Sequence, residues 1–211
     1  MSTEWGSASS FSRASSFSRA SSSSGASSSS GRRLLMTALV GLMLLAVPGP
    51  AGSKVFFAQD EALALAFPDS DRVDRQTFVL TDDQAARIEK LSRSPLDSRL
   101  VTVHTGWQGE HLQGYAVIDI HTVRTLPEAF MVVLRPDGVI QSLRVLAFYE
   151  PLEYLPTKRW YEQFFDKSAE EPLRVGRDIH GVVGATLSTR AASTGVRRAL
   201  AYYEVLLNGE L

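Results

Sequence analysis

Apolar residues alternate with a period of two along much of the chain between residues 99 and 148, and two glycine-containing segments interrupt the pattern. Alternation of this kind predicts half-buried β-strands. The interruptions at residues 106–109 and 136–138 are typical of tight turns between neighbouring antiparallel strands. We therefore expect an antiparallel meander of about four to five strands. The expected strands are residues 76–80, 99–105, 112–121, 129–135 and 139–148.

The strand expected at residues 112–121 carries apolar side chains on both of its faces. One face holds an alanine and two isoleucines at the even positions, whereas the other holds Tyr115 and Val117, followed by Asp119 and His121. A sheet that is apolar on both sides needs helices on at least one of them. The sequence therefore predicts the α+β class, with an antiparallel sheet covered by helices.

Three short helices are expected around this sheet. The first, at residues 59–67, ends before Pro68. Thr81 is followed three residues later by Gln84, a capping-box sequence that opens a second helix running through residue 91. The third helix is expected at residues 158–167. The residues expected on the buried side of the second helix are Ala85, Ile88 and Leu91.

A long amphipathic helix is expected to follow from Ser188 to about residues 208–209. Its apolar residues recur with the helical period, so one stripe of the helix is expected to be buried. Gly195 interrupts the helix and is expected to weaken it by about 1 kcal/mol. The residues of the stripe are Ala192, Val196, Ala199, Leu200, Tyr203 and Leu207.

The first 53 residues differ in composition from the rest of the chain. Residues 1–31 are rich in serine and contain the repeated hexamers ASSFSR and ASSSSG, so we expect a disordered tail. Arg32 and Arg33 then precede an apolar run at residues 34–47, about the length of a secretory h-region. We interpret residues 32–53 as a signal peptide, or as an N-terminal membrane anchor if the signal is not cleaved. Residues 54–211 would then be one domain with an exported, periplasmic or otherwise extracytoplasmic location.

Composition excludes several classes of function. The 211 residues contain no cysteine, which excludes disulfides, iron–sulfur ligation and thiol catalysis. The formal net charge of −1 gives no basic excess for binding nucleic acid. The four histidines are too scattered to form a recognisable metal-ligand spacing. A redox role would therefore require a bound organic cofactor.

The segment at residues 180–188, HGVVGATLS, comes directly before the long helix. A glycine turn that brings Thr186 to a helix start places its hydroxyl where backbone N–H groups converge on an anion. This segment resembles the flavinylation motif of the FMN-binding domain family. That family includes exported flavin subunits of the Rnf and sodium-translocating NADH:quinone oxidoreductase complexes, and stand-alone exported proteins.

The resemblance implies that residues 54–211 are an FMN-binding domain in which Thr186 forms a phosphoester bond to FMN. Gly184 and Ala185 would form its turn, with Gly181 before them and Ser188 as a downstream hydroxyl. In the family, a dedicated flavin transferase makes the bond from FAD, using magnesium. The resemblance also implies a membrane redox complex or a quinone-linked electron donor as a partner.

Two positions differ from the family pattern. His180 stands where the family commonly has aspartate, and Val183 stands where it commonly has serine or threonine. The segment at residues 150–154 and the following Trp160 also look similar to small stand-alone members. The alternative interpretation of the motif is a plain glycine turn in which Ser188 is the N-cap of the helix.

Other side chains are secondary candidates for a flavin site. Glu150 and Glu153 would be either paired carboxylates near the flavin or caps for the helix that follows Pro156. Tyr154 would stack on the flavin ring. The remaining candidates are Trp107, Tyr115 and Trp160 for stacking, Arg124 with Thr125 for the ring or phosphate, and His180 for the phosphate.

These observations lead to the hypothesis of an exported flavoprotein that transfers electrons in a membrane-linked redox chain. Two alternatives remain open at the level of sequence. One is a non-redox accessory module of the same fold that binds a partner, and the other is an FMN-dependent reductase with its own substrate.

Overall fold

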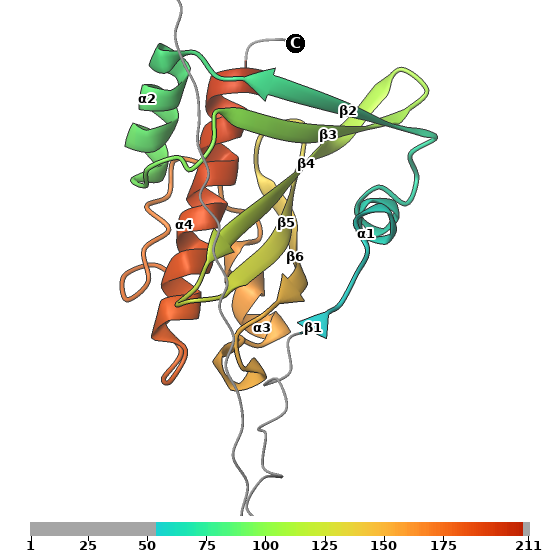
Figure 1. The fold of residues 1–211 in the computed structure, drawn as a ribbon. Coiled ribbons are helices and arrows are strands. Elements are labelled where there is room, and N and C mark those ends of the chain that lie inside the picture. The colour runs from blue at the N-terminus through green and yellow to red at the C-terminus, as the bar shows by residue number, and fades with distance from the viewer. Residues whose placement is uncertain (1–53, 209–211) are drawn as a thin grey trace, which may run out of the picture. The chain divides into compact units, whose positions relative to one another are not determined.

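The computed structural model describes residues 54–208, which form a sheet with helices on both sides (Figure 1). Our predictions for the serine-rich tail at residues 1–31 and for the signal or anchor at residues 32–53 lie outside the described residues. Within residues 54–208, no helix is both long enough and apolar enough to span a bilayer.

The sheet has six strands in the order β1-β6-β5-β4-β3-β2, and every neighbouring pair is antiparallel. The predicted α+β class and antiparallel meander are therefore confirmed, whereas the predicted number of strands was too low. The strands are β1 (Lys54–Val55), β2 (Arg72–Val79), β3 (Leu100–Gln108), β4 (His111–Thr122), β5 (Pro127–Leu134) and β6 (Ile140–Phe148).

Strand β1 was not predicted, because its two residues are too few to show the alternation of apolar and polar side chains that marks a strand. The turn predicted at residues 106–109 was also wrong, since β3 continues through Gly106 and the hairpin turns after Gln108. Gly106 serves close packing instead. A Cβ atom there would lie 2.5 Å from the ring of Phe67, which covers this part of the strand.

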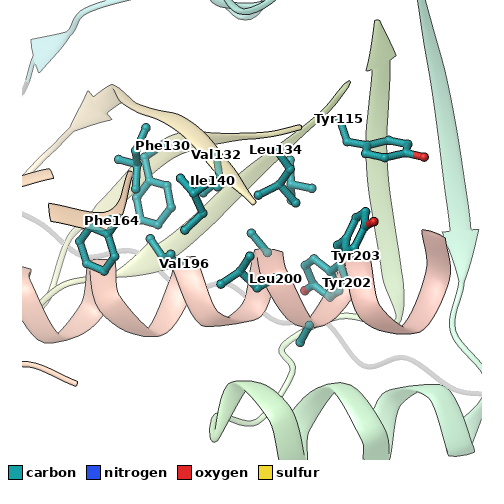
Figure 2. Packing of buried hydrophobic residues seen from close by; sticks show 14 of the residues in the cluster. Tyr115, Phe130, Val132, Leu134, Ile140, Phe164, Val196, Leu200, Tyr202 and Tyr203 are labelled. Carbon is teal, nitrogen blue, oxygen red and sulfur yellow. The ribbon is translucent and has the colours of Figure 1, made fainter. Parts of the chain in front are cut away.

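Helices cover both faces of the sheet (Figure 1). On one face lie α4 (Thr186–Tyr202) and α2 (Asp82–Ser92), and side chains such as Val196 and Leu200 of α4 pack toward Phe130 and Val132 of the sheet (Figure 2). The shorter α1 (Gln59–Ala66) packs on the opposite face. The two faces predicted for β4 therefore enter two different cores.

The predicted capping box of α2 is present. The Thr81 hydroxyl accepts from the N–H of Gln84 at 3.2 Å, and the Thr81 N–H donates to the Gln84 side chain at 3.0 Å. The predicted burial of Leu91 was wrong, because this residue is 45% exposed and Ser92 is buried in its place. Helical geometry explains the exchange, since positions three and seven after Ala85 share its face, whereas position six does not.

The predicted buried stripe of the long helix is confirmed at all six positions. The helix begins at Thr186, with Ala185 as its N-cap, and continues after Tyr202 as the π-helical turn η3 (Tyr203–Leu207). Gly195 does more than interrupt the helix. A Cβ atom at this position would lie 2.6 Å from Asp119 Oδ1 and from the ring of Phe130, so glycine allows α4 to approach β4 and β5.

The segment between β6 and α4 contains short helical turns. The helix predicted at residues 158–167 is shorter, because α3 (Lys158–Tyr161) passes into a single 3₁₀ turn, η2 (Glu162–Phe164). Another 3₁₀ turn, η1 (Leu152–Tyr154), precedes it. The rings of Trp160 and Phe164 contact each other with centroids 5.4 Å apart, as their spacing predicted.

Candidate functional site

A cavity of about 180 Å³ lies at the N-terminus of α4. Three segments that are distant in sequence form its wall: the β4–β5 turn, the region after β6 and the start of α4. This cavity, called the helix-start cavity below, brings together most of the residues that the sequence motif singled out. It is lined by Val123, Arg124, Glu150, Tyr154, Gly184, Ala185, Thr186, Leu187 and Ser188.

Thr186 is the first residue of α4 and is exposed. Its hydroxyl has no hydrogen-bond partner within residues 54–208. The N-cap, Ala185, supplies no side-chain hydrogen bond, so the N–H groups of the first turn are left without an intrahelical acceptor. The interpretation of Ser188 as the N-cap is wrong, because Ser188 lies inside this first turn.

Ser188 is the most informative side chain of the cavity. The residue is only 1% exposed, and its Oγ atom has no hydrogen-bond partner among the described residues. An unsatisfied buried hydroxyl costs about 1–3 kcal/mol, so such groups in native proteins require an explanation. Ser188 therefore indicates that the cavity binds a polar ligand or water.

Backbone conformation explains the glycine of the motif. Gly184 has φ of 84°, in the left-handed region that favours glycine, and a Cβ atom there would meet nothing within 4 Å. The N–H of Ala185 donates to the carbonyl of Val182 at 3.1 Å and closes the turn. Gly184 thus sets the path by which the chain enters α4.

Glu150 has a role that its position in the sequence did not reveal. One of its oxygens, Oε1, accepts from the N–H groups of Arg124 at 3.2 Å, Thr125 at 2.7 Å and Leu126 at 2.8 Å. The Thr125 hydroxyl also donates to it, at 3.3 Å. The backbone hydrogen bonds from Thr125 and Leu126 lower the pKa of the Glu150 carboxyl. Glu150 therefore fixes the β4–β5 turn, and Glu153 does not line the cavity.

His180 and Gly181 do not line the cavity, unlike the other five predicted binding residues. The backbone of His180 is tied to the α3 region, since its N–H donates to Gln163 Oε1 at 2.8 Å and its carbonyl accepts from Trp160 Nε1 at 2.6 Å. The His180 residue itself is exposed. These contacts place the start of the motif segment while leaving the imidazole outside the cavity.

Of the four aromatic candidates, Tyr154 alone lines the cavity. Trp160 is buried against Phe164, and Tyr115 packs on Tyr203 in the core. The guanidinium of Arg72 lies over the ring of Trp107, near the far end of β3. Tyr154 therefore remains the only one of the four in a position to contact a ligand of this cavity.

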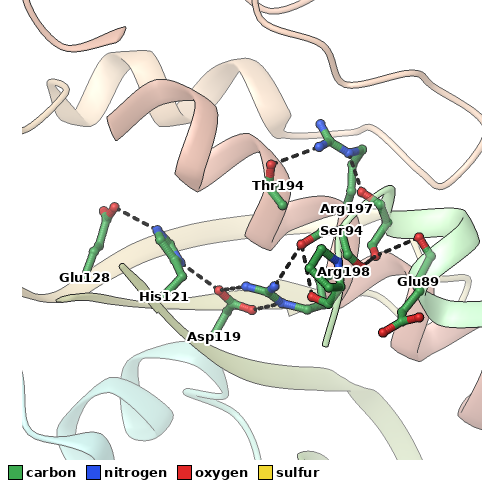
Figure 3. Close-up of polar contacts among 10 residues, drawn as sticks. Glu89, Ser94, Asp119, His121, Glu128, Thr194, Arg197 and Arg198 are labelled. Carbon is green, nitrogen blue, oxygen red and sulfur yellow. Dashed lines mark hydrogen bonds and ion pairs between the residues drawn. The ribbon is translucent and has the colours of Figure 1, made fainter. Parts of the chain in front are cut away.

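Several charged side chains from different parts of the sequence contact one another under α4 (Figure 3), and the sequence did not predict these contacts. Arg198 donates to both oxygens of Asp119, at 2.7 and 2.9 Å, and His121 Nδ1 lies 2.8 Å from Asp119 Oδ1. His121 Nε2 lies 3.2 Å from Glu128 Oε2, and the Tyr161 hydroxyl donates to Glu128 Oε1 at 2.9 Å. These five residues are called the ion network. One feature of the sequence could have indicated this network: Asp119 and His121 lie two residues apart on the strand face that the long helix covers.

The ion network alters the protonation of its own members. Burial lowers the pKa of His121, but hydrogen bonds with Asp119 and Glu128 outweigh this effect and raise the pKa to about 9. Burial raises the pKa of Asp119, whereas hydrogen bonds with His121 and Arg198 bring it below its ordinary value. His121 is therefore a cation at neutral pH and is held between two carboxylates.

A second cavity, of about 470 Å³, adjoins the first and shares Val123 and Leu187 with it. Its wall includes Arg190 and Arg198 of α4 and His121 of β4. The two cavities together thus run from the start of α4 toward the ion network. Within residues 54–208 there is no group of three or more histidine, aspartate or glutamate side chains arranged to hold a metal ion.

Comparison with protein-family models gives no match for this chain, and comparison with curated proteins gives none either. The assignment of a function therefore depends on the motif and on the geometry of the helix-start cavity.

Proposed function

We propose that this protein is an exported flavoprotein that carries FMN through a phosphoester bond to Thr186 and serves as an electron carrier in a membrane-linked redox chain. The observation that carries the proposal is an exposed Thr186 hydroxyl at a helix start without a side-chain cap, beside the buried hydroxyl of Ser188, where neither hydroxyl has a partner among the described residues. The motif that resembles the FMN-binding domain family lies at this place.

The chemistry of the cavity fits a phosphodiester. Such a group carries one negative charge, which is favoured by the free N–H groups and the positive end of the dipole at a helix N-terminus. Ser188 has an O–H group available for donation to a phosphate oxygen. Arg124 also lines the cavity, and its guanidinium is a donor group suited to phosphate. The groups present therefore match a phosphate in charge and in donor capacity.

The size of the cavities fits a ligand that extends beyond the phosphate. The helix-start cavity, at about 180 Å³, is below the roughly 300–1,000 Å³ typical of pockets for small molecules, whereas the adjoining cavity of about 470 Å³ lies within that range. Tyr154 lines the smaller cavity and offers a ring for stacking. When bound, the flavin supplies the electron-transfer chemistry, and the protein supplies attachment, orientation and electrostatics.

Attachment requires that Thr186 be accessible to a flavin transferase, and the residue is exposed. The Thr186 oxygen forms a bond to the FMN phosphorus of FAD as the bond from that phosphorus to the AMP phosphate breaks. AMP leaves, and the hydroxyl proton passes to a base on the transferase. A covalent bond prevents loss of the cofactor by dilution, which suits a protein that functions outside the cytoplasm.

Expression of the full chain with a flavin transferase tests this proposal. After denaturation, flavin fluorescence should stay with the protein band, and the intact mass should increase by one FMN less one water. Thr186→Val, which removes the hydroxyl but keeps the shape, should lose both signals. Thr157→Val, a matched change at an exposed threonine outside the cavity, should retain them. A colourless wild-type protein, or flavin retained in Thr186→Val, would reject the proposal.

The electron-carrier role and the location require separate tests. The reduced protein should donate electrons to a membrane acceptor, or the oxidised protein should accept electrons from a membrane donor. Stopped-flow changes in flavin absorbance with and without membranes measure both. Turnover of a small substrate by the isolated protein would favour a reductase instead. Fractionation of cells that express the full chain should place it outside the cytoplasm.

A further inference from the structure

We propose that Arg124 balances the charge of the phosphate at the start of α4, and that Glu150 is the positioning residue that holds Arg124 in place. This inference rests on the proposed function, because the phosphate in question is that of FMN. It gives specific roles to two residues from two other segments of the chain, which the sequence alone named only as secondary candidates.

The first argument comes from the construction of the β4–β5 turn. Glu150 is only 4% exposed, and a single one of its oxygens receives three consecutive backbone N–H groups, from residues 124 to 126. The turn has one further backbone hydrogen bond, from the N–H of Val123 to the carbonyl of Leu126 at 3.1 Å. The conformation of the turn, and with it the point from which the Arg124 side chain projects, therefore depends on the Glu150 carboxylate.

The second argument is charge balance inside the cavity. Among the described residues that line it, Arg124 is the one cation and Glu150 the one anion. A phosphate at the start of α4 would share this cavity with the Glu150 carboxylate, and like charges at close range repel. The helix terminus contributes only about half a positive charge. A phosphate in this cavity therefore needs the guanidinium of Arg124.

The third argument is that Arg124 is free to bind. No ion pair engages its guanidinium in the part of the chain that the structure describes. A guanidinium presents a planar fork of donors that matches two phosphate oxygens at once. Ser188, buried in the same cavity and without a partner among residues 54–208, independently indicates a polar ligand or water there.

Two measurements on the full chain test the role of Arg124. In Arg124→Gln, the rate of covalent flavin incorporation by the transferase should fall by about tenfold, the change expected for loss of a charge-assisted hydrogen bond. In the protein that does become flavinylated, the ³¹P resonance of the phosphodiester should move by more than its line width. Arg87→Gln, at an exposed arginine of α2 far from the motif in sequence, serves as the control and should leave both unchanged.

The positioning role of Glu150 is tested by a double-mutant cycle. Glu150→Gln should shift the ³¹P resonance when Arg124 is present, and should cause no further shift in the Arg124→Gln background, because Glu150 acts through Arg124. Equal shifts in both backgrounds would overturn the positioning role. Wild-type incorporation and resonance in Arg124→Gln would overturn the inference as a whole, whereas a wild-type protein without covalent flavin would contradict the proposed function itself.

Discussion

Helix α4 carries two polar regions that differ in how their groups are satisfied. In the ion network, each charged side chain meets a partner of opposite charge, and Tyr161 donates to Glu128. In the helix-start cavity, the Ser188 hydroxyl has no partner among the described residues, and the first turn has no side-chain cap. The first region is complete as the chain folds, whereas the second leaves a buried hydroxyl and the N–H groups of a helix start available to a ligand or to water.

This difference separates residues that stabilise the fold from residues that serve binding. Removing one member of a buried charge network leaves the others uncompensated, which is costly. Removing a group that has no partner costs little and can even stabilise the protein. We therefore expect substitutions in the ion network to lower stability and to leave flavin attachment intact in the folded protein. Substitutions of Thr186 and Ser188, the unpartnered hydroxyls of the cavity among the described residues, should change stability little and should impair flavin attachment or the stabilisation that flavin gives.

The largest effect is expected for Asp119→Ala. This change leaves Arg198 and His121 buried without their shared carboxylate, so the free energy of unfolding should fall by about 3–5 kcal/mol. Urea unfolding followed by circular dichroism measures it. Thr186→Val should change stability by less than about 0.5 kcal/mol, because Thr186 is exposed. If the two variants lost similar amounts of unfolding free energy, the ion network and the helix-start cavity would not differ in their contribution to stability.

The second prediction concerns the pH dependence of stability. The pKa of His121 is about 9 in the folded protein, against 6.5 for the ordinary side chain, because Asp119 and Glu128 hold it as a cation despite its burial and the nearby Arg198. A histidine whose pKa is raised on folding stabilises fully below the unfolded value, and this contribution is lost as the pH rises through the folded value. Between pH 6 and 10, the free energy of unfolding should fall by about 3 kcal/mol through this histidine.

Urea unfolding at intervals across that pH range measures this loss. In His121→Gln, which removes the titrating group, the decline should flatten, although the variant starts from a lower stability. An equally steep decline in His121→Gln would assign the pH dependence to other groups and would remove His121 from the charged part of the network.

The third prediction tests the close approach of α4 to the sheet. Gly195→Ala brings a Cβ atom to 2.6 Å from Asp119 Oδ1, so the helix or the carboxylate must shift, at a cost of about 1–3 kcal/mol. This outcome opposes helix propensity, by which alanine would be favoured over glycine by about 1 kcal/mol. Gly181→Ala is the control, because its nearest neighbour would lie at 3.4 Å. A more stable Gly195→Ala variant would show that packing does not require the glycine.

Much of this architecture follows from local patterns. The buried stripe of α4, the capping box of α2 and the meander depend on residues a few positions apart, which sequence periodicity reveals. The role of Glu150 depends on hydrogen bonds to a turn more than 20 residues earlier, and no local pattern encodes such a contact. Thr186 and Gly184 lie in one local motif, so the sequence predicted them as site residues. The hydrogen bond from the Arg124 N–H to Glu150 joins two distant segments, so the sequence did not predict it.

Changes of about 1 kcal/mol or less are expected from a matched pair of buried serines on α4. Ser193 Oγ donates to the carbonyl of Leu173 at 2.5 Å, whereas Ser188 Oγ has no partner in the described chain. Ser193→Ala should therefore cost about 1 kcal/mol, and Ser188→Ala should be neutral or stabilising by up to about 1 kcal/mol. Thermal unfolding of the two variants without flavin measures the difference.

Attachment of flavin should reverse this order. In the flavinylated protein the Ser188 hydroxyl would donate to the phosphate, so Ser188→Ala should lose part of the stabilisation that flavin gives to the wild type, while Ser193→Ala should keep it. If Ser188→Ala instead costs as much as Ser193→Ala in the absence of flavin, the Ser188 hydroxyl already has a partner, such as a buried water. In that case the Ser188 hydroxyl would no longer be evidence that the cavity binds a ligand.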